Sequence, residues 1–234
     1  MIIRYLYHNI PNIITTCNLV CGCIAIVLIF NGSLLYAACF VFFGAMFDFC
    51  DGLVARLLNV KSAIGKDLDS LADMVTFGMV PGFAMYKFMA GMVGTHPFIY
   101  TSIAIPILSA WRLAKFNNDP RQSSEFYGLP TPANALFFMS LPVVAVYETF
   151  VAEFFMRYIY TVPTLCIIFS ILLVSEVRLF SLKIKDFDIT NNLYQIILLM
   201  SSLVLLVSVK LIAIPLIVIL YLILSVIKNY ILKK

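Results

Sequence analysis

The sequence predicts an all-α protein built as a polytopic bundle of transmembrane helices. Hydrophobic residues make up 62% of its 234 residues and charged residues only 12%, and the mean hydropathy is +1.01. A water-soluble domain of this length needs a more charged surface. Long apolar runs recur along nearly the whole chain, and a helix needs about 20 such residues to cross ~30 Å of hydrocarbon. Because the runs are continuous and not alternating, they favour helices over the strands of a barrel.

About eight membrane spans are expected, and turn-forming residues separate several of them. Asn31-Gly32-Ser33 ends the first span, Gly91 to Pro97 ends the third, and a polar stretch from Asn117 to Thr131 follows the fourth. The last two runs are divided only by the tight turn Val207 to Lys210, so a count of about six or seven stays open. The expected spans are Ile13 to Phe30, Leu34 to Leu57, Leu68 to Met89, Phe98 to Lys115, Pro132 to Phe150, Ile159 to Val177, Leu193 to Val209 and Leu211 to Ile227.

The distribution of Lys and Arg supports this topology with a cytoplasmic N-terminus. Among the 16 cations, only Lys87, Arg157 and Lys210 fall toward the opposite side of the membrane. Basic residues concentrate on the cytoplasmic side of short loops. The net charge of +4 therefore reflects membrane topology and a surface that attracts anionic lipids, and it does not indicate nucleic-acid binding.

Three segments are expected along the chain. Residues 1–12 (MIIRYLYHNIPN) mix apolar, aromatic and basic side chains, which predicts an amphipathic segment in the membrane interface. Residues 13–186 form the transmembrane core, because they contain every motif with recognisable chemistry. Residues 187–234 form a C-terminal transmembrane hairpin in which no chemical motif is found.

Four carboxylates mark the candidate site. Asp48 and Asp51 are three residues apart and Asp69 and Asp73 four apart, so each pair projects from one face of a helix. Taken singly, each could be a helix-end carboxylate paired with a nearby cation. Ionised side chains at bilayer depth are costly, however, and four in one short stretch favour function. Opposed carboxylate pairs suit Mg²⁺ or Mn²⁺ better than zinc or copper. The cations that could instead pair with them are Arg56, Lys61 and Lys66.

The residues around the carboxylates suit a bound diphosphate. Gly52 and Gly65 have no Cβ to block the close approach of a ligand. Arg56 lies one helical turn after Gly52, where its guanidinium could hold phosphate oxygens, and Lys66 would add positive charge. Each of these residues alone has an ordinary structural explanation. Together with the aspartates they predict a metal and phosphate pocket open to the cytoplasm.

The spacing Asp48-x-x-Asp51-Gly52-x-x-Ala55-Arg56, then eight residues, then Gly65-x-x-x-Asp69-x-x-x-Asp73, resembles the signature of the CDP-alcohol phosphotransferases. The resemblance implies a membrane enzyme with a six-helix core, often homodimeric. Such enzymes move a phosphatidyl group from CDP-diacylglycerol, or a related CDP-alcohol, to an acceptor hydroxyl and release CMP. By the same resemblance, two Mg²⁺ or Mn²⁺ ions are held by Asp48, Asp51, Asp69 and Asp73. Asp73 is also expected to be the general base. The residues expected to hold CDP are Gly52, Arg56, Ser62 and Gly65.

Three other segments indicate which acceptor receives the phosphatidyl group. Pro11-Asn12-x-x-Thr15-x-x-Asn18, the run Trp111 to Asn117, and Phe126 to Ala133 are similar to segments of the bacterial membrane-integral phosphatidylserine synthases. This resemblance implies L-serine as acceptor and an enzyme of a bacterial cytoplasmic membrane, with its active site facing the cytoplasm. The expected ligands of the serine are Arg112, Asn117 and Arg121, although the two arginines could equally be ordinary loop charges.

Two alternatives remain open from the sequence. The acceptor could be glycerol 3-phosphate or an inositol phosphate, whose extra phosphate calls for more cations than residues 112–121 offer. A protein of another class, a divalent-cation transporter, could use the same acidic residues. Arg56 beside them argues against transport, because a fixed guanidinium repels cations.

Overall fold

The computed structural model describes residues 2–60, 62–119, 126–180 and 192–232, and in these ranges the protein is all-α, as predicted. A two-residue strand, β1 (Phe126–Tyr127), pairs antiparallel with β2 (Arg178–Leu179) and is the exception to the helical pattern. The helical elements are α1 (Ile2–Phe30), α2 (Leu34–Leu57), α3 (Ala63–Asp73), the π-helical η1 (Met74–Met79), α4 (Val80–Val93), the 3₁₀ helix η2 (Pro97–Ile103), α5 (Ala104–Asn118), α6 (Thr131–Tyr147), α7 (Thr149–Arg157), α8 (Thr161–Val174), α9 (Leu193–Val209), the 3₁₀ helix η4 (Lys210–Ile212) and α10 (Ala213–Leu232).

By length and composition, four of the described helical stretches could cross a membrane, or up to five if α6 and α7 count as one. These two helices meet at a bend of 111°. The expected span Leu68 to Met89 coincides with α3, η1 and α4, which follow one another without a break. The last two expected spans coincide with α9 and α10, which count here as one stretch, Leu193–Tyr230. The tight turn predicted between them is present, and Lys210 adopts a φ of 49° there.

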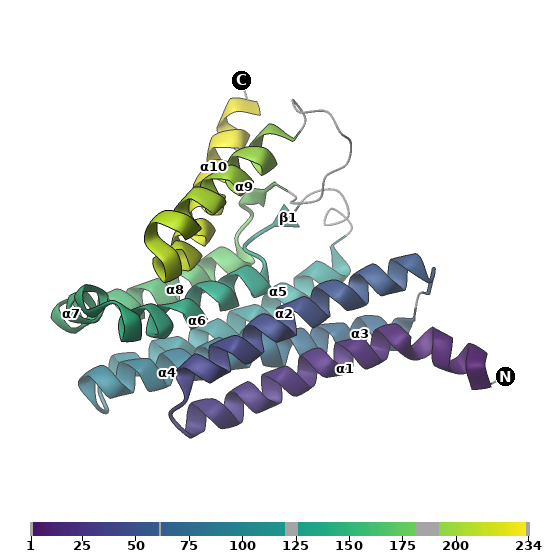
Figure 1. Ribbon diagram of the computed structural model, residues 1–234, viewed down its shortest axis with the longest axis horizontal. Helices are drawn as coiled ribbons and strands as arrows, with labels where there is room; N and C mark the ends of the chain where they lie inside the picture. Colours follow the sequence, from purple (N-terminus) through teal and green to yellow (C-terminus); the bar gives the residue numbers. More distant parts are fainter. Residues whose placement is uncertain (1, 61, 120–125, 181–191, 233–234) are drawn as a thin grey trace.

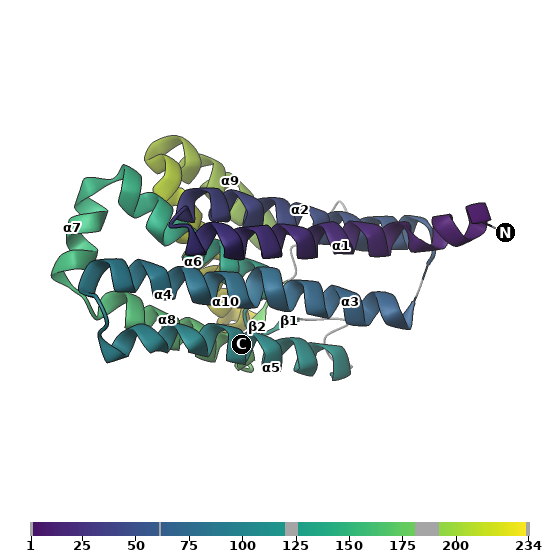
Figure 2. The same cartoon turned by 90° about the horizontal axis from the view of Figure 1, so that it is seen from below.

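The helices form two groups with different directions. Helices α1 to α6 and α8 lie roughly along one direction, whereas α9 and α10 rise steeply across the bundle (Figure 1). Seen from below, α3 and α4 form one long helix beside α1 and α2 (Figure 2). Helix α1 runs unbroken from Ile2, so the expected interfacial segment 1–12 belongs to the same helix as the first expected span.

Small residues bring α1 and α2 close to η1. A Cβ on Gly22 would lie 2.4 Å from Thr76 Oγ1, and a Cβ on Gly44 would lie 2.7 Å from Thr76 Cγ2. Only glycine permits these approaches, because a methyl group at either position would overlap the threonine. The fully buried Thr76 hydroxyl donates a hydrogen bond to Asn18 O at 3.0 Å. This crossing fixes the depth at which α1 meets the end of α3.

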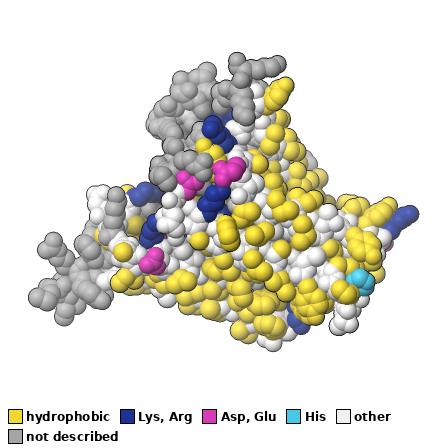
Figure 3. All heavy atoms as spheres, turned by 180° about the vertical axis from the view of Figure 1, so that it is seen from behind, with side chains coloured by type: hydrophobic (Ala, Val, Ile, Leu, Met, Phe, Trp, Pro, Cys, Tyr) yellow, Lys and Arg dark blue, Asp and Glu magenta, His cyan; other side chains and the backbone are white. Residues whose placement is uncertain are grey.

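The surface of the bundle is suited to lipid. Hydrophobic side chains cover most of the face shown in Figure 3, and its charged side chains gather mainly in one zone. Large apolar side chains such as Phe49, Leu57 and Ile64 are 66%, 72% and 74% exposed. So much exposed apolar surface is unfavourable in water and marks contact with a membrane or a partner.

Candidate active site

Helices α2 and α3 bring three of the predicted carboxylates together. Asp48, Asp51 and Asp69 each offer a ligand oxygen, and the three oxygens lie within 4.8 Å of one another. Helix α2 supplies the first two and α3 supplies the third, as the helical spacing predicts. Their donor atoms are hard carboxylate oxygens, the type that Mg²⁺ and Mn²⁺ take from proteins. This trio therefore fits a divalent cation.

Asp73 lies one turn beyond Asp69 and is not part of the trio. Its side chain is only 8% exposed, and Asn18 Nδ2 donates to its Oδ1 at 3.2 Å. It is the last residue of α3 before the π-helical segment η1. Such segments occur often at functional sites because they redirect the side chains next to them.

Helix α1 supplies polar partners to which the sequence reasoning gave no role. Thr15 Oγ1 lies 2.5 Å from Asp51 Oδ2 and 3.0 Å from Pro11 O, so its single proton has two acceptors in reach. Asn18 contacts Asp73, and its buried Oδ1 has no hydrogen-bond partner within the described part of the chain. Asn12, Thr15 and Asn18 recur every three residues in an otherwise apolar run. That spacing was a signal that one face of α1 lines a polar site.

Arg112 of α5 is the buried cation of the site. It is 8% exposed and its Nη1 donates to Thr131 Oγ1 at 3.2 Å, whereas its Nε has no hydrogen-bond partner among the residues that the structure describes. Its charge interacts with those of Asp48 and Asp73. No ion pair within 4 Å joins Arg112 to an aspartate in the described part of the chain. Four neighbouring carboxylates carry more negative charge than Arg112 can balance, which favours bound cations.

A cavity of about 530 Å³ opens beside the trio, between α1, α2 and α3. Asp51 and Asp69 lie in its wall together with Gly52. A Cβ added to Gly52 would meet no atom within 4 Å, so this glycine is not required for helix packing and leaves space in the cavity. The remaining lining residues are Pro11, Asn12, Thr15, Ala55, Val60, Ser62, Ala63, Gly65 and Lys66.

The other residues expected to hold CDP also have local structural roles. Ser62 caps the N-terminus of α3, because its Oγ accepts a hydrogen bond from Gly65 N at 3.2 Å. A Cβ on Gly65 would lie 2.8 Å from Asn12 Oδ1, so this glycine allows α1 to approach α3. Arg56 does not line the cavity, and its Nε donates to Gly52 O of its own helix at 2.8 Å.

The three residues expected to bind serine are not brought together. Arg112 lies within electrostatic range of Asp48 and Asp73, whereas Asn117 Nδ2 donates to Ser70 Oγ at 2.7 Å. The carbonyl of Asn117 accepts from Lys66 Nζ at 2.8 Å, so Asn117 ties the end of α5 to α3. Arg121 lies outside the described residues. Of the three residues expected to bind serine, Arg112 is therefore the one that lies near the aspartates in the described part of the chain.

Comparisons with known proteins identify a family to which the chain is similar. A family model described as CDP-alcohol phosphatidyltransferase matches residues 8–174. The chain is 38% identical over 127 residues to a CDP-diacylglycerol–serine O-phosphatidyltransferase of Bacillus subtilis (strain 168), covering 53% of this chain and 70% of that protein. An enzyme of the same name from Saccharomyces cerevisiae is 41% identical over 102 residues, covering 40% and 36%. An archaetidylserine synthase of Methanothermobacter thermautotrophicus is 30% identical over 149 residues, covering 63% of each chain.

Proposed function

The chain belongs to the CDP-alcohol phosphatidyltransferase family, and on that premise we propose that it transfers the phosphatidyl group of CDP-diacylglycerol to the hydroxyl of L-serine and releases CMP. One observation carries the proposal: the carboxylate trio Asp48, Asp51 and Asp69 borders a cavity, with Asp73 and Arg112 buried nearby. The names of the relatives supply the acceptor. The chain covers between about a third and 70% of the three relatives described, so the whole reaction stays a proposal.

Asp48, Asp51 and Asp69 are proposed to hold two Mg²⁺ or Mn²⁺ ions with help from Asp73. When bound, these ions would neutralise charge on the attacking and leaving oxygens of the phosphoryl group. The hydroxyl of Thr15 orients Asp51 through the short hydrogen bond between them. Asn18 plays the corresponding part for Asp73.

The cavity beside the trio is proposed to receive the CDP group. Gly52 leaves space for it, and Ser62 and Gly65 contribute the wall at the start of α3. Lys66 also lines this wall and brings a positive charge toward the diphosphate. Arg56 reaches the phosphates only if its side chain turns away from Gly52 O, which is a low-cost change for an exposed arginine.

Asp73 is proposed as the general base. Its carboxylate takes the proton of the serine hydroxyl, and that oxygen forms a bond to the phosphatidyl phosphorus. The bond from phosphorus to the CMP oxygen breaks, and CMP leaves with the electron pair. Arg112 holds the serine carboxylate, because its buried Nε has no partner among the described residues and its charge interacts with that of Asp73.

The proposal places this chemistry at the cytoplasmic face of a bacterial-type cytoplasmic membrane. We propose about eight spans, of which α1, α2, α3 with α4, η2 with α5, α6 and α8 form the six-helix core. The distribution of Lys and Arg supports this orientation. The boundary expected at residues 186–187 lies outside the described residues, so α9 and α10 are assigned to the C-terminal hairpin by their position alone. A homodimer is proposed from the resemblance to the family.

The proposed function is tested by CMP release from CDP-diacylglycerol with purified protein and Mg²⁺ or Mn²⁺. L-Serine, glycerol 3-phosphate and inositol phosphate are compared as acceptors, with no acceptor as the blank. We expect release that depends on both L-serine and the metal. Release with another acceptor would replace the substrate within the same family. Absence of release with all three would contradict the enzyme assignment and reopen cation transport.

A further inference from the structure

The C-terminal helix α10 is fastened by two hydrogen bonds to strand β2 and to Phe180, the residue that follows the strand. Tyr221 Oη donates to Phe180 O at 2.9 Å, and Asn229 Nδ2 donates to Arg178 O at 2.6 Å. The Tyr221 ring also packs edge-on against the Phe180 ring, with centroids 5.1 Å apart. Tyr221 and Phe180 are only 7% and 6% exposed, so losing the first bond would leave a buried carbonyl without its partner.

Strand β2 is in turn bound to the segment that leads into α6. Phe126 pairs with Leu179 and Tyr127 with Arg178 in the antiparallel ribbon. Beyond the ribbon, Gly128 N donates to Val177 O at 2.9 Å and Leu129 N to Leu172 O at 3.0 Å.

Gly128 permits this close contact between the segment and the end of α8. It has a φ of 77°, and a Cβ there would lie 2.4 Å from Leu173 O. Residues 126–129 therefore lie tightly between the end of α8 and strand β2.

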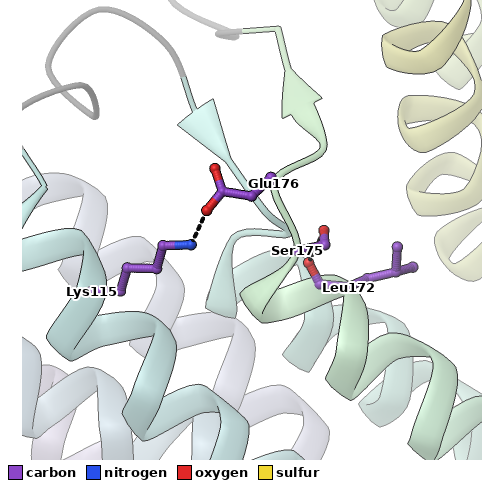
Figure 4. Close-up of polar contacts among 4 residues, drawn as sticks. All are labelled: Lys115, Leu172, Ser175 and Glu176. Atoms are coloured by element: carbon purple, nitrogen blue, oxygen red, sulfur yellow. Dashed lines mark hydrogen bonds and ion pairs between the residues drawn. The ribbon is translucent and has the colours of Figure 1, made fainter.

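This segment leads to Thr131, which forms a hydrogen bond with Arg112. Thr131 is the first residue of α6, is fully buried, and accepts the hydrogen bond from Arg112 Nη1. A second connection joins α5 to the same region, since Lys115 forms an ion pair with Glu176, just after α8 (Figure 4). Tyr221 also lies within electrostatic range of Arg112. A continuous series of contacts thus runs from α10 through β2 and β1 to Arg112.

We propose that the C-terminal helix α10 sets the position of Arg112 through the β1–β2 ribbon, with Tyr221 and Asn229 as positioning residues for the acceptor. The inference rests on the proposed function, in which Arg112 holds the acceptor's carboxylate. Strand β2 and α10 both lie beyond residue 174, where the match to the family model ends. The hairpin therefore acts on one substrate, the acceptor, because its contacts lead to Arg112 and not to the cavity between α1, α2 and α3.

The kinetic test compares Tyr221→Phe and Asn229→Ala with a control on the same helix, Ser225→Ala. Ser225 is also buried, but its hydroxyl donates to Tyr221 O within α10, so its loss leaves the ribbon untouched. In full-length enzyme we expect the KM for L-serine to rise about two- to tenfold in the first two variants, the range expected for one lost hydrogen bond. The KM for CDP-diacylglycerol should stay unchanged in all three. Equal changes in both KM values, or no change in either, would overturn the proposal.

Hydrogen exchange supplies a readout that needs no substrate. We expect the amides of Gly128 and Leu129 to exchange faster in Tyr221→Phe and Asn229→Ala than in the wild type, and at the wild-type rate in Ser225→Ala. Unchanged exchange in all variants would overturn the proposal that α10 holds the β1–β2 ribbon in place, and this result does not depend on which acceptor the enzyme uses. If the wild-type enzyme uses an acceptor other than L-serine, the proposed function is wrong, but the proposed role of α10 is not yet contradicted. The KM comparison is then made with that acceptor, and a selective rise would still support the role of α10.

Discussion

The bundle α1–α8 and the hairpin α9–α10 are both largely apolar, yet they differ in where their polar groups lie. In the described part of the bundle the buried charged side chains lie at one place, where Asp51, Asp73 and Arg112 are each less than one-tenth exposed. The hairpin carries no acidic residue between 192 and 234, and its buried Tyr221 and Ser225 bond to backbone carbonyls. It also lies across the bundle and not along it (Figure 1). The candidate catalytic residues thus lie in α1–α8, whereas the buried polar residues named in α10 make contacts with the backbone.

Energetics explain why the separation is sharp. An ionised side chain at the centre of a membrane-spanning helix costs roughly 2.5 to 3.5 kcal/mol on insertion scales, so such residues are rare there and mark a candidate functional site. A buried hydroxyl that bonds to a carbonyl costs little, because its hydrogen bond is satisfied locally. Substitutions at the aspartates should therefore abolish chemistry, and those in the hairpin should only adjust it.

The largest effect is expected for Asp73→Asn. Removing a general base typically lowers turnover about 10²- to 10⁴-fold, whereas the isosteric amide should preserve binding of CDP-diacylglycerol. CMP release and substrate binding measure the two quantities. Asp67→Asn is the matched control, because Asp67 lies on the same helix and is exposed. Turnover at the wild-type level in Asp73→Asn would contradict the assignment of the base.

A smaller effect is expected for Thr15→Val, which removes the hydroxyl beside Asp51 but keeps the branched shape. Loss of a group that orients a metal ligand typically weakens metal binding about 10- to 100-fold. The Mg²⁺ or Mn²⁺ concentration for half-maximal CMP release should rise accordingly. Thr16→Val is the control, since Thr16 is exposed and bonds only to Asn12 O of its own helix. Equal metal requirements in the two variants would argue against a cation at the trio.

Gly52→Ala tests whether Gly52 is needed for helix packing or for binding of CDP-diacylglycerol. The new methyl group meets no protein atom within 4 Å, so the thermal stability should not fall. In the cavity it should raise the KM for CDP-diacylglycerol roughly tenfold, because overfilling a fitted site typically costs 1 to 3 kcal/mol. Gly22→Ala should behave in the opposite way and destabilise the protein, since its Cβ would lie 2.4 Å from Thr76 Oγ1. A normal KM in Gly52→Ala would place CDP elsewhere.

The smallest effect is expected on the outer surface of the hairpin. Val207 is 83% exposed, and Val207→Ala should leave both KM values and turnover within about twofold of the wild type, as surface substitutions usually do. The same kinetic assay measures this. A large loss of activity would contradict the view that the hairpin acts through the contacts of α10 alone.

The helical spacing of the aspartates was enough to predict that Asp48 shares a helix face with Asp51 and Asp69 with Asp73, because residues three or four apart do so in any helix. That Asp69 and not Asp73 joins Asp48 and Asp51 depends on how α2 and α3 pack. The turn at Lys210 was also predictable, because the polar residues Ser208 and Lys210 interrupt the apolar run there. The all-α class followed from composition.

Features that depend on how helices rotate against one another were not predictable. Asn117 and Arg112 share a polar segment, but five residues on a helix place them on different faces, and Asn117 turns to Ser70. The β1–β2 ribbon joins residues about 50 positions apart, too short a pairing to leave a sequence pattern. The prediction of about eight spans exceeds the four or five found by length and composition, because α3 to α4 does not pass that test, α8 is short, and α9 and α10 count as one stretch.

The central claim is that the serine hydroxyl attacks the phosphatidyl phosphorus with Asp73 as base. It is tested most directly with L-serine carrying ¹⁸O in its hydroxyl, CDP-diacylglycerol, metal and purified enzyme, followed by mass spectrometry of the lipid product. We predict phosphatidylserine that retains the label, one CMP released for each lipid formed, and labelled product formed about 10²- to 10⁴-fold more slowly with Asp73→Asn. Phosphatidic acid formed with CMP and without label would mean that water is the nucleophile, and it would contradict the account.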